Sequence, residues 1–178
     1  DGSADYLSQT FSGAGNNKVG TISFWVKRNK VGEAHQLFHS RSGSGSSQLV
    51  LDSNDKIYWR LEDTGGNQVG QKTTKAVFRD PTAWTHIVVN FSCAAAQQKI
   101  YVNGSEVAVA DLATTVNPSD TDTTISDAAT HYIGATHAPG DYADVYLAEY
   151  IYIDGTQSDA SSFGETDDNG VWGPIKPS

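Results

Sequence analysis

The sequence predicts an all-β domain of many short strands, and three observations support that prediction. Runs in which apolar and polar residues alternate recur along the chain, as expected for strands with one buried face. Turn-forming residues separate these runs, and the 178 residues include 17 glycines. No segment of twelve or more residues keeps a helical period. A chain of this length fits one domain and can bury a core without a disulfide or a metal ion.

The alternation locates the individual strands. In Thr21–Lys27, the apolar residues Ile22, Phe24 and Val26 occupy one face of the predicted strand. Trp84–Cys93 shows the same period and is predicted to be a second strand. The remaining predicted strands are Gln48–Leu51, Lys56–Glu62, Lys99–Asn103, Glu106–Val109, His131–Ala135 and Val145–Asp154.

Turn chemistry predicts how neighbouring strands connect. Asn103-Gly104 predicts a type I′ hairpin turn, because both residue types tolerate positive φ. Ser53-Asn54-Asp55 predicts a second hairpin turn. Three stretches rich in Gly, Ser, Thr, Asn or Asp are predicted loops: Arg41–Ser47, Asp63–Gly70 and Val116–Asp127.

Composition narrows the classes of partner. The formal net charge is −9, which disfavours binding to nucleic-acid phosphates or anionic membranes, and solubility is the simpler explanation of the acidic excess. No signal peptide, transmembrane run or lipidation motif is visible, so membrane insertion is not expected. Cys93 is the only cysteine, which rules out an intramolecular disulfide and a cysteine zinc site. Because the sequence starts at Asp1 and contains no Met, we expect a processed or excised piece of a longer protein.

Four stretches in chain order carry a resemblance to a known family: Asp1–Leu7; Thr21–Lys27; Trp84–Val89 with Lys99–Gly104; and Ile133-Gly134 with Tyr146–Tyr152. Together they resemble the laminin-G-like family of concanavalin-A-type domains. The resemblance implies a two-sheet antiparallel jelly-roll sandwich over residues 1–157, with a C-terminal extension or linker over residues 158–178. Ser158–Phe163 in that extension could form one helical turn.

A second resemblance lies in the extension. Phe163–Thr166 and Val171–Pro174 are similar to segments that follow such domains in bacteriophage structural and tail-fibre proteins. This similarity implies a location on the virion surface or outside the cell. It also implies that the domain is one part of a multidomain or oligomeric protein.

Catalytic patterns of the resembling family are missing from the sequence. Its glucanases carry a Glu-x-Asp-x-x-Glu strand and its alginate lyases a Gln-x-His strand, and neither pattern occurs here. Glu149 stands alone in its strand, and the adjacent Glu62 and Asp63 should point to opposite faces. The five His residues lack metal-ligand spacing. We therefore expect no enzymatic activity.

Sugar recognition needs an aromatic surface beside amides, carboxylates or Arg. One predicted site is loop-based and gathers such residues: Tyr58, Arg60, Asp63, Asn67, His137, Asp141 and Tyr142. An alternative site is a sheet face carrying His86, Asn90, Lys99 and Tyr101. Trp25, Trp59 and Trp84 are interpreted as core residues, because they lie among Ile, Val and Leu.

The resemblance also implies a structural calcium ion, with Asp1, Asp5 and Asp144 as candidate ligands. The alternative is that these residues cap turns or face solvent. No other cofactor is expected. The sequence thus predicts a non-catalytic lectin-like module that binds a glycan or a host cell-surface ligand and could form a homo-oligomer. A structural or decoration domain making subunit contacts, or a polysaccharide-degrading enzyme of the same fold, remain the alternatives.

Overall fold

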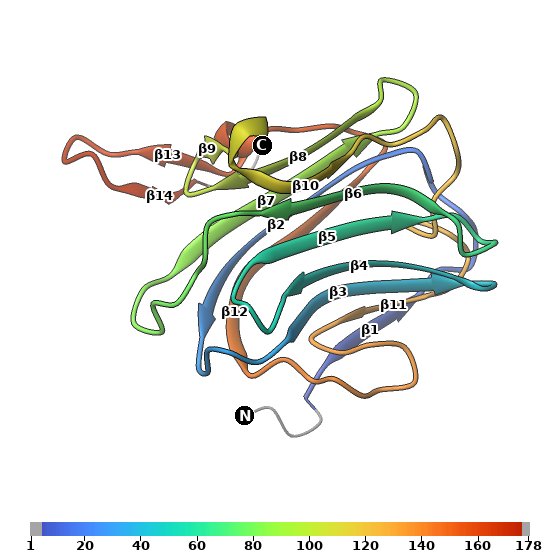
Figure 1. The fold of residues 1–178 in the computed structure, drawn as a ribbon, viewed down its shortest axis with the longest axis horizontal. Helices are drawn as coiled ribbons and strands as arrows, with labels where there is room; N and C mark the ends of the chain where they lie inside the picture. The colour runs from blue at the N-terminus through green and yellow to red at the C-terminus, as the bar shows by residue number, and fades with distance from the viewer. Residues whose placement is uncertain (1–4, 176–178) are drawn as a thin grey trace.

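The computed structural model describes residues 5–175, and in it two antiparallel sheets pack face to face (Figure 1). The strands in chain order are β1 (Leu7–Thr10), β2 (Val19–Arg28), β3 (His35–Ser42), β4 (Gly45–Leu51), β5 (Ile57–Glu62), β6 (Gln68–Thr74), β7 (Thr85–Ser92), β8 (Gln97–Val102), β9 (Ser105–Glu106), β10 (Leu112–Val116), β11 (Thr130–Ile133), β12 (Val145–Asp154), β13 (Gly164–Thr166) and β14 (Trp172–Pro174). The structure confirms the predicted all-β jelly-roll sandwich.

The two sheets differ in size. The larger sheet has the order β1-β11-β3-β4-β5-β6-β10, and the smaller has the order β12-β2-β7-β8-β9. In Figure 1, β3, β4, β5 and β6 lie side by side in one layer. The hairpin of β13 and β14 projects at the upper left, beside β9. Two 3₁₀ turns, Val109–Asp111 and Ala160–Ser162, complete the described structure.

The core lies between the sheets and follows the predicted alternation. Ile22, Phe24 and Val26 of β2 are buried there, and Trp59 of β5 packs edge-on against Phe91 of β7 with ring centroids 6.0 Å apart. Burial of such side chains contributes about 1.5–3 kcal/mol each to folding. Cys93 is buried as a free thiol, and burial raises its pKa to about 11.

Both predicted hairpin turns are present. Asn103 and Gly104 have φ of 46° and 84°, which joins β8 to β9 through the predicted left-handed conformation. Asp55 has φ of 64° in the turn before β5. Ser158–Phe163 contains the predicted single turn, at Ala160–Ser162.

The strands β3, β6 and β10 of the larger sheet were not predicted. The strand β3 is buried on both faces, although it contains His35, Gln36 and His39, so its hydrophobicity does not alternate. The strand β6 has one large apolar residue, Val69, and buries the polar side chain of Lys72 instead. The predicted loops Arg41–Ser47 and Asp63–Gly70 are therefore tight turns flanked by strand residues.

The C-terminal extension packs on the smaller sheet. A turn held by Asp167, which accepts hydrogen bonds from the backbone N–H groups of Asn169 and Val171, joins β13 to β14. Phe163 and Trp172 then contact the outer face of the sheet around Val88. This second apolar cluster covers part of that face.

Candidate functional site

The outer face of the larger sheet carries a hollow that combines an aromatic ring, amides and carboxylates. We call it the sheet-face hollow and define it by its lining residues: Ala34, Gln36, Gln48, Val50, Asp52, Tyr58, Thr136 and Asp141. Tyr58 comes from β5, where it alternates with the core residues Ile57 and Trp59. Asp141 comes from the loop after β11, and no other described residue hydrogen-bonds or ion-pairs with it.

A row of polar side chains crosses the same face next to the hollow. Cα register places His39 opposite Gln48, Gln48 opposite Arg60, and Arg60 opposite Gln71. Adjacent strands lie about 4.8 Å apart, so these side chains are neighbours. Arg60 turns toward Glu62, with Nη2 2.6 Å from Oε1. The row extends the hollow by a guanidinium group, amides and an imidazole.

Two stacked histidines close one side of this row. The rings of His39 and His137 are parallel within 15°, with centroids 5.4 Å apart. Arg41 donates from Nη1 to His137 Nε2 at 2.7 Å, so the proton of a neutral His137 lies on Nδ1. Burial, helped by the positive charge of Arg41, lowers the pKa of both rings, to about 4 for His39. Both are therefore neutral near pH 7.

Three buried nitrogens on this face have no hydrogen-bond partner among the described residues: His39 Nδ1, Arg60 Nε and His137 Nδ1. A buried polar group without a partner costs about 1–3 kcal/mol. Such groups need an explanation in a folded protein. This face therefore carries polar groups below its surface as well as on its surface.

The structure gathers some of the predicted site residues and separates others. Tyr58 and Asp141 line the hollow, and Arg60 and His137 lie on the same sheet face. Asp63 and Asn67 instead bind each other in the turn between β5 and β6, where Asn67 Nδ2 donates to Asp63 Oδ2 at 2.9 Å.

Tyr142 follows the hollow residue Asp141 but points elsewhere. Its hydroxyl donates to the carbonyl of Pro139, and its ring lies 6.3 Å from that of Tyr6. The lining residues Gln36, Asp52 and Thr136 were not predicted. Gln48 could have been found from the sequence, since it alternates with Leu49 as Tyr58 does with Trp59.

The candidate calcium ligands lie at one end of the sandwich, as far as the structure describes them. Asp1 lies outside the described residues. Asp5 lines a pocket with Ala143, the neighbour of Asp144. Asp144 Oδ1 accepts a hydrogen bond from Asn29 Nδ2 at 2.9 Å, and Asp144 Oδ2 lies 3.6 Å from Lys30 Nζ. Within residues 5–175 no three His, Cys, Asp or Glu side chains group as metal ligands, and the calcium ion stays a prediction.

The alternative site on the smaller sheet is covered. Asn90 donates to the carbonyl of Ser158, and His86 is buried between the rings of Trp25 and Trp172. The expectation that Trp25 and Trp84 belong to the core is wrong, because both lie on the outer face of this sheet and Trp84 is 43% exposed. Trp59 is a core residue, as predicted.

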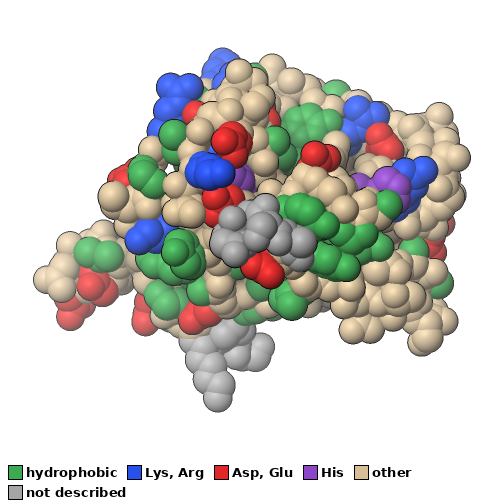
Figure 2. All heavy atoms as spheres, turned by 90° about the horizontal axis from the view of Figure 1, so that it is seen from below, with side chains coloured by type: hydrophobic (Ala, Val, Ile, Leu, Met, Phe, Trp, Pro, Cys, Tyr) green, Lys and Arg blue, Asp and Glu red, His purple; other side chains and the backbone are tan. Residues whose placement is uncertain are grey.

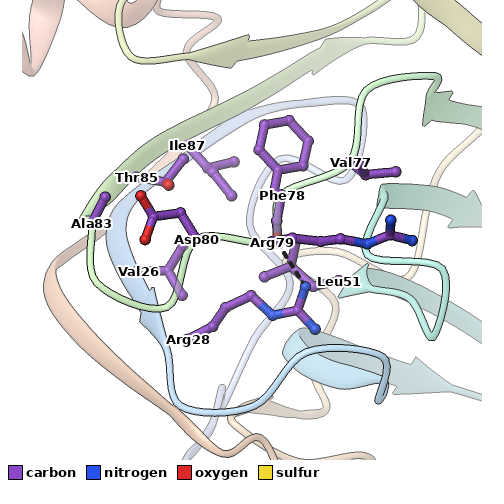
Figure 3. Close-up of a pocket in the computed structure, with 10 residues that line it drawn as sticks. All are labelled: Val26, Arg28, Leu51, Val77, Phe78, Arg79, Asp80, Ala83, Thr85 and Ile87. Carbon is purple, nitrogen blue, oxygen red and sulfur yellow. Dashed lines mark hydrogen bonds between the residues drawn. The ribbon is translucent and has the colours of Figure 1, made fainter.

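A further pocket at the edge of the sandwich is structural (Figure 3). Arg28 enters it and donates to the carbonyl of Phe78 at 2.9 Å, as the dashed line in Figure 3 shows. Arg28 also pairs with the buried carboxylate of Asp55 at 2.7 Å. Arg28 further donates to the backbone carbonyls of Lys30 and Glu33, so its donors are occupied by the protein itself.

The surface charges show no gathering of one sign on the face viewed in Figure 2. There, Lys and Arg side chains are scattered among acidic and hydrophobic ones. A nucleic-acid interface would present a basic stripe or patch. Among residues 5–175, no helix has the length and apolar character needed to span a bilayer.

Comparison with known proteins places these features in a family. Residues 1–150 match the family model described as the concanavalin A-like lectin/glucanases superfamily, of the laminin G type. No curated protein sequence matches the chain.

Solved structures share the fold at low sequence identity. Domains LG4-5 of the mouse laminin alpha1 chain align with a TM-score of 0.62 and 12% identity, over 97% of this chain and 42% of that one. The receptor binding domain of botulinum neurotoxin D gives 0.60 and 14%, over 88% and 39%. The heptameric SAP-like pentraxin from Limulus polyphemus gives 0.57 and 13%, over 83% and 68%. The chain thus spans about two fifths of the first two structures. At these identities the likeness establishes the fold.

Proposed function

This chain belongs to the concanavalin A-like lectin/glucanases superfamily, and from that premise we propose that it is a non-catalytic module that binds a glycan in the sheet-face hollow. The observation that carries the proposal is the lining of that hollow. An aromatic ring, two amides, a hydroxyl and two carboxylates meet there, from Tyr58, Gln36, Gln48, Thr136, Asp52 and Asp141.

Each group in the hollow suits one part of a sugar. The face of Tyr58 can pack against the apolar C–H face of a pyranose. The side-chain amide of Gln48 can donate to and accept from hydroxyls, and the carboxylate of Asp141 can accept from them. Gln36 is buried and its Nε2 donates to the carbonyl of Phe38, so it shapes the floor of the hollow. The polar row beside the hollow would extend contacts to a second sugar unit.

Similar folds support a binding role outside the cell. One of the structural neighbours is described as a receptor binding domain and another as a laminin domain pair. We extend this role to a glycan or another ligand on a host cell. We further propose that this chain lies at a virion surface or in the extracellular space. Fold alone does not fix function, so the proposal depends on the hollow.

The first test is a glycan-array screen of the purified chain, with and without EDTA. Specific hits that survive EDTA would support a lectin whose site needs no metal. Hits abolished by EDTA would support a calcium-dependent lectin and direct attention to Asp1, Asp5 and Asp144. A blank array from folded protein would contradict glycan binding and favour a structural domain that contacts neighbouring subunits.

Substitutions in the hollow then test its position. Tyr58→Ala and Asp141→Asn should each weaken binding of the best array hit by about tenfold, as expected for a lost stacking surface or a lost charged acceptor. The matched controls are Tyr146→Ala and Asp168→Asn, which change an exposed tyrosine of β12 and an exposed aspartate of the β13–β14 turn. Equal effects of hollow and control variants would refute this location.

A further inference from the structure

The opposite side of the sandwich carries a second pocket with different chemistry. We call it the tryptophan groove and define it by its lining residues: Trp25, Trp84, Ala148, Glu149, Trp172 and Pro174. Strand β2 supplies Trp25, whose neighbours Phe24 and Val26 point into the core, so Trp25 points outward. Strand β12 supplies Glu149, and the C-terminal hairpin brings Trp172 over the sheet.

The aromatic wall of the groove is held in place. The ring of His86 stacks on Trp25 at a centroid distance of 4.9 Å and on Trp172 at 5.9 Å. Trp172 Nε1 donates to His86 Nδ1 at 3.0 Å, which leaves the proton of a neutral His86 on Nε2, 3.0 Å from Ser23 Oγ. Burial lowers the pKa of His86 to about 4, so this ring is neutral near pH 7. The wall is therefore uncharged and is held by ring stacking and hydrogen bonds.

Glu149 brings a negative charge to the groove. It lies in a β-bulge of β12, where the register with β2 shifts between Ala148 and Ile151. Its φ of 50° is unusual for a non-glycine residue, and bulges commonly redirect a side chain. Glu149 is exposed and has no ion-pair partner among residues 5–175, and no Lys or Arg is among the lining residues.

The groove has few hydrogen-bonding groups for a sugar. The indole N–H of Trp172 is taken by His86, and Trp25 Nε1 is buried. The N–H of Trp84 and the carboxylate of Glu149 are the polar side-chain groups that remain. A pyranose has several hydroxyls to satisfy, whereas a quaternary ammonium group has none. Indole faces and a carboxylate both attract a cation, and such aromatic sites recognise quaternary ammonium groups.

From this combination we propose that the tryptophan groove binds a quaternary ammonium group of the choline type. The ring faces of the tryptophans contact the methyl groups, and Glu149 compensates the positive charge. The net charge of −9 favours the approach of a cation in general. This site is independent of the sheet-face hollow, since the two lie on different sheets.

The four indole N–H groups give a direct readout by ¹H–¹⁵N NMR. Titration of the whole chain with choline should shift the signals of Trp25, Trp84 and Trp172 saturably, while Trp59 in the core stays in place. The matched probe is 3,3-dimethyl-1-butanol, which has the shape of choline without its charge. It should cause shifts at least tenfold weaker at equal concentration.

Phosphocholine in parallel identifies the source of the cation. Phosphocholine binding as tight as that of choline indicates a headgroup as the ligand. Tenfold weaker binding indicates a free cation, because Glu149 repels the phosphate. Equal shifts with choline and its neutral isostere, no shift with choline, or shifts with methyl glucoside instead would overturn the proposal.

Two variants separate the contributions of charge and ring. Glu149→Gln should weaken choline binding by about tenfold, whereas Glu165→Gln on the neighbouring hairpin, outside the groove, should change it less than twofold. Trp84→Ala removes an exposed ring and should weaken binding by about fivefold. An unchanged Trp59 signal verifies that each variant is folded. Equal affinity of Glu149→Gln and the unsubstituted chain would rule out charge recognition.

Discussion

At the scale of single residues, Asp55 shows how a buried charge is kept in this fold. Its carboxylate contacts Arg28 at 2.7 Å and Arg79 at 2.6 Å, and accepts the backbone N–H of Gly32 at 2.6 Å. Burial opposes its ionisation, but these hydrogen bonds and charges outweigh burial and lower the pKa of Asp55 to about 2. The ionised carboxylate of Asp55 therefore links three segments of the chain.

Removing this charge should destabilise the protein strongly. Asp55→Asn keeps a residue that tolerates the positive φ but leaves the buried guanidinium of Arg28 without its anion. Breaking a buried pair in this way costs about 3–5 kcal/mol in the free energy of unfolding, measurable by urea denaturation at pH 7. The control is Glu33→Gln, which changes an exposed pair with Lys30 and should cost less than about 1 kcal/mol.

The pH dependence of the same variant has a defined sign. The pKa of Asp55 lies below its ordinary value of 3.8, so its contribution to stability is present above pH 3.8 and is lost as pH falls toward 2. Asp55→Asn should remove that part of the acid destabilisation. A loss below about 1 kcal/mol at pH 7 would contradict the assigned role.

At the scale of elements, one hairpin turn supports the C-terminal extension. Gly104 has φ of 84°, and a Cβ there would lie 2.5 Å from Cε3 of Trp172. Gly104→Ala should therefore lower the free energy of unfolding by about 2–4 kcal/mol and displace the Trp172 ring. The matched control, Gly170→Ala, has φ of 80° but open space around the new methyl group, so it should cost only about 1–2 kcal/mol.

Thermal denaturation and the indole signal of Trp172 check this prediction together. A Gly104→Ala protein no less stable than Gly170→Ala would show that the hairpin adjusts without strain. An unmoved Trp172 signal would show that the contact with Gly104 does not hold the ring.

The elements that the sequence predicted are those whose environment is local. The hairpin at Asn103-Gly104 depends on two residues. In β2 and β7, polar residues such as Ser23 and His86 alternate with the core residues, so the period is readable although both faces of these strands are largely buried. The strand β3 was missed because its polar residues Gln36 and His39 are buried, with His137 from the loop after β11 stacked on His39. Burial by segments that are distant in the sequence leaves no alternating pattern within the strand itself.

Strand period alone predicts which strand residues of the candidate site point outward. Tyr58 and Arg60 point outward because Trp59 and Leu61 point inward. The same rule predicts that Trp25 points outward. Its interpretation as a core residue followed from its apolar character and is wrong. Asp63 and Asn67 were chosen by residue type, yet their short separation lets them satisfy each other. Only the fold brings Asp141 to Tyr58.

At the scale of the whole molecule, the five histidines share one property. Burial lowers the pKa of His35, His39, His86, His131 and His137. They lie in both sheets and beside them, from β3 to the loop after β11. The folded protein consequently binds fewer protons than the unfolded chain when the pH falls below the ordinary histidine pKa of 6.5.

Stability should therefore fall on mild acidification. For a base whose pKa is lowered by folding, the contribution is fully present above pH 6.5 and is lost as pH falls to the folded pKa, about 4 for His39 and His86. Each of these two groups contributes a slope of about 1.4 kcal/mol per pH unit around pH 5. Urea denaturation at pH 7.5, 6 and 5 measures this slope above the range in which most carboxylates titrate.

A substitution of His86 tests how much of the pH dependence of stability comes from that ring. His86→Gln cannot be protonated, so its slope should be smaller by about 1.4 kcal/mol per pH unit, whatever its stability at pH 7.5. Equal free energies of unfolding at pH 7.5 and pH 5 in the unsubstituted chain would mean that the histidines titrate normally in the folded state. In that case the stacked pairs of His39 with His137 and of His86 with Trp172 would open readily to solvent. The sheet-face hollow and the tryptophan groove would then be less rigid than the packing of their rings implies.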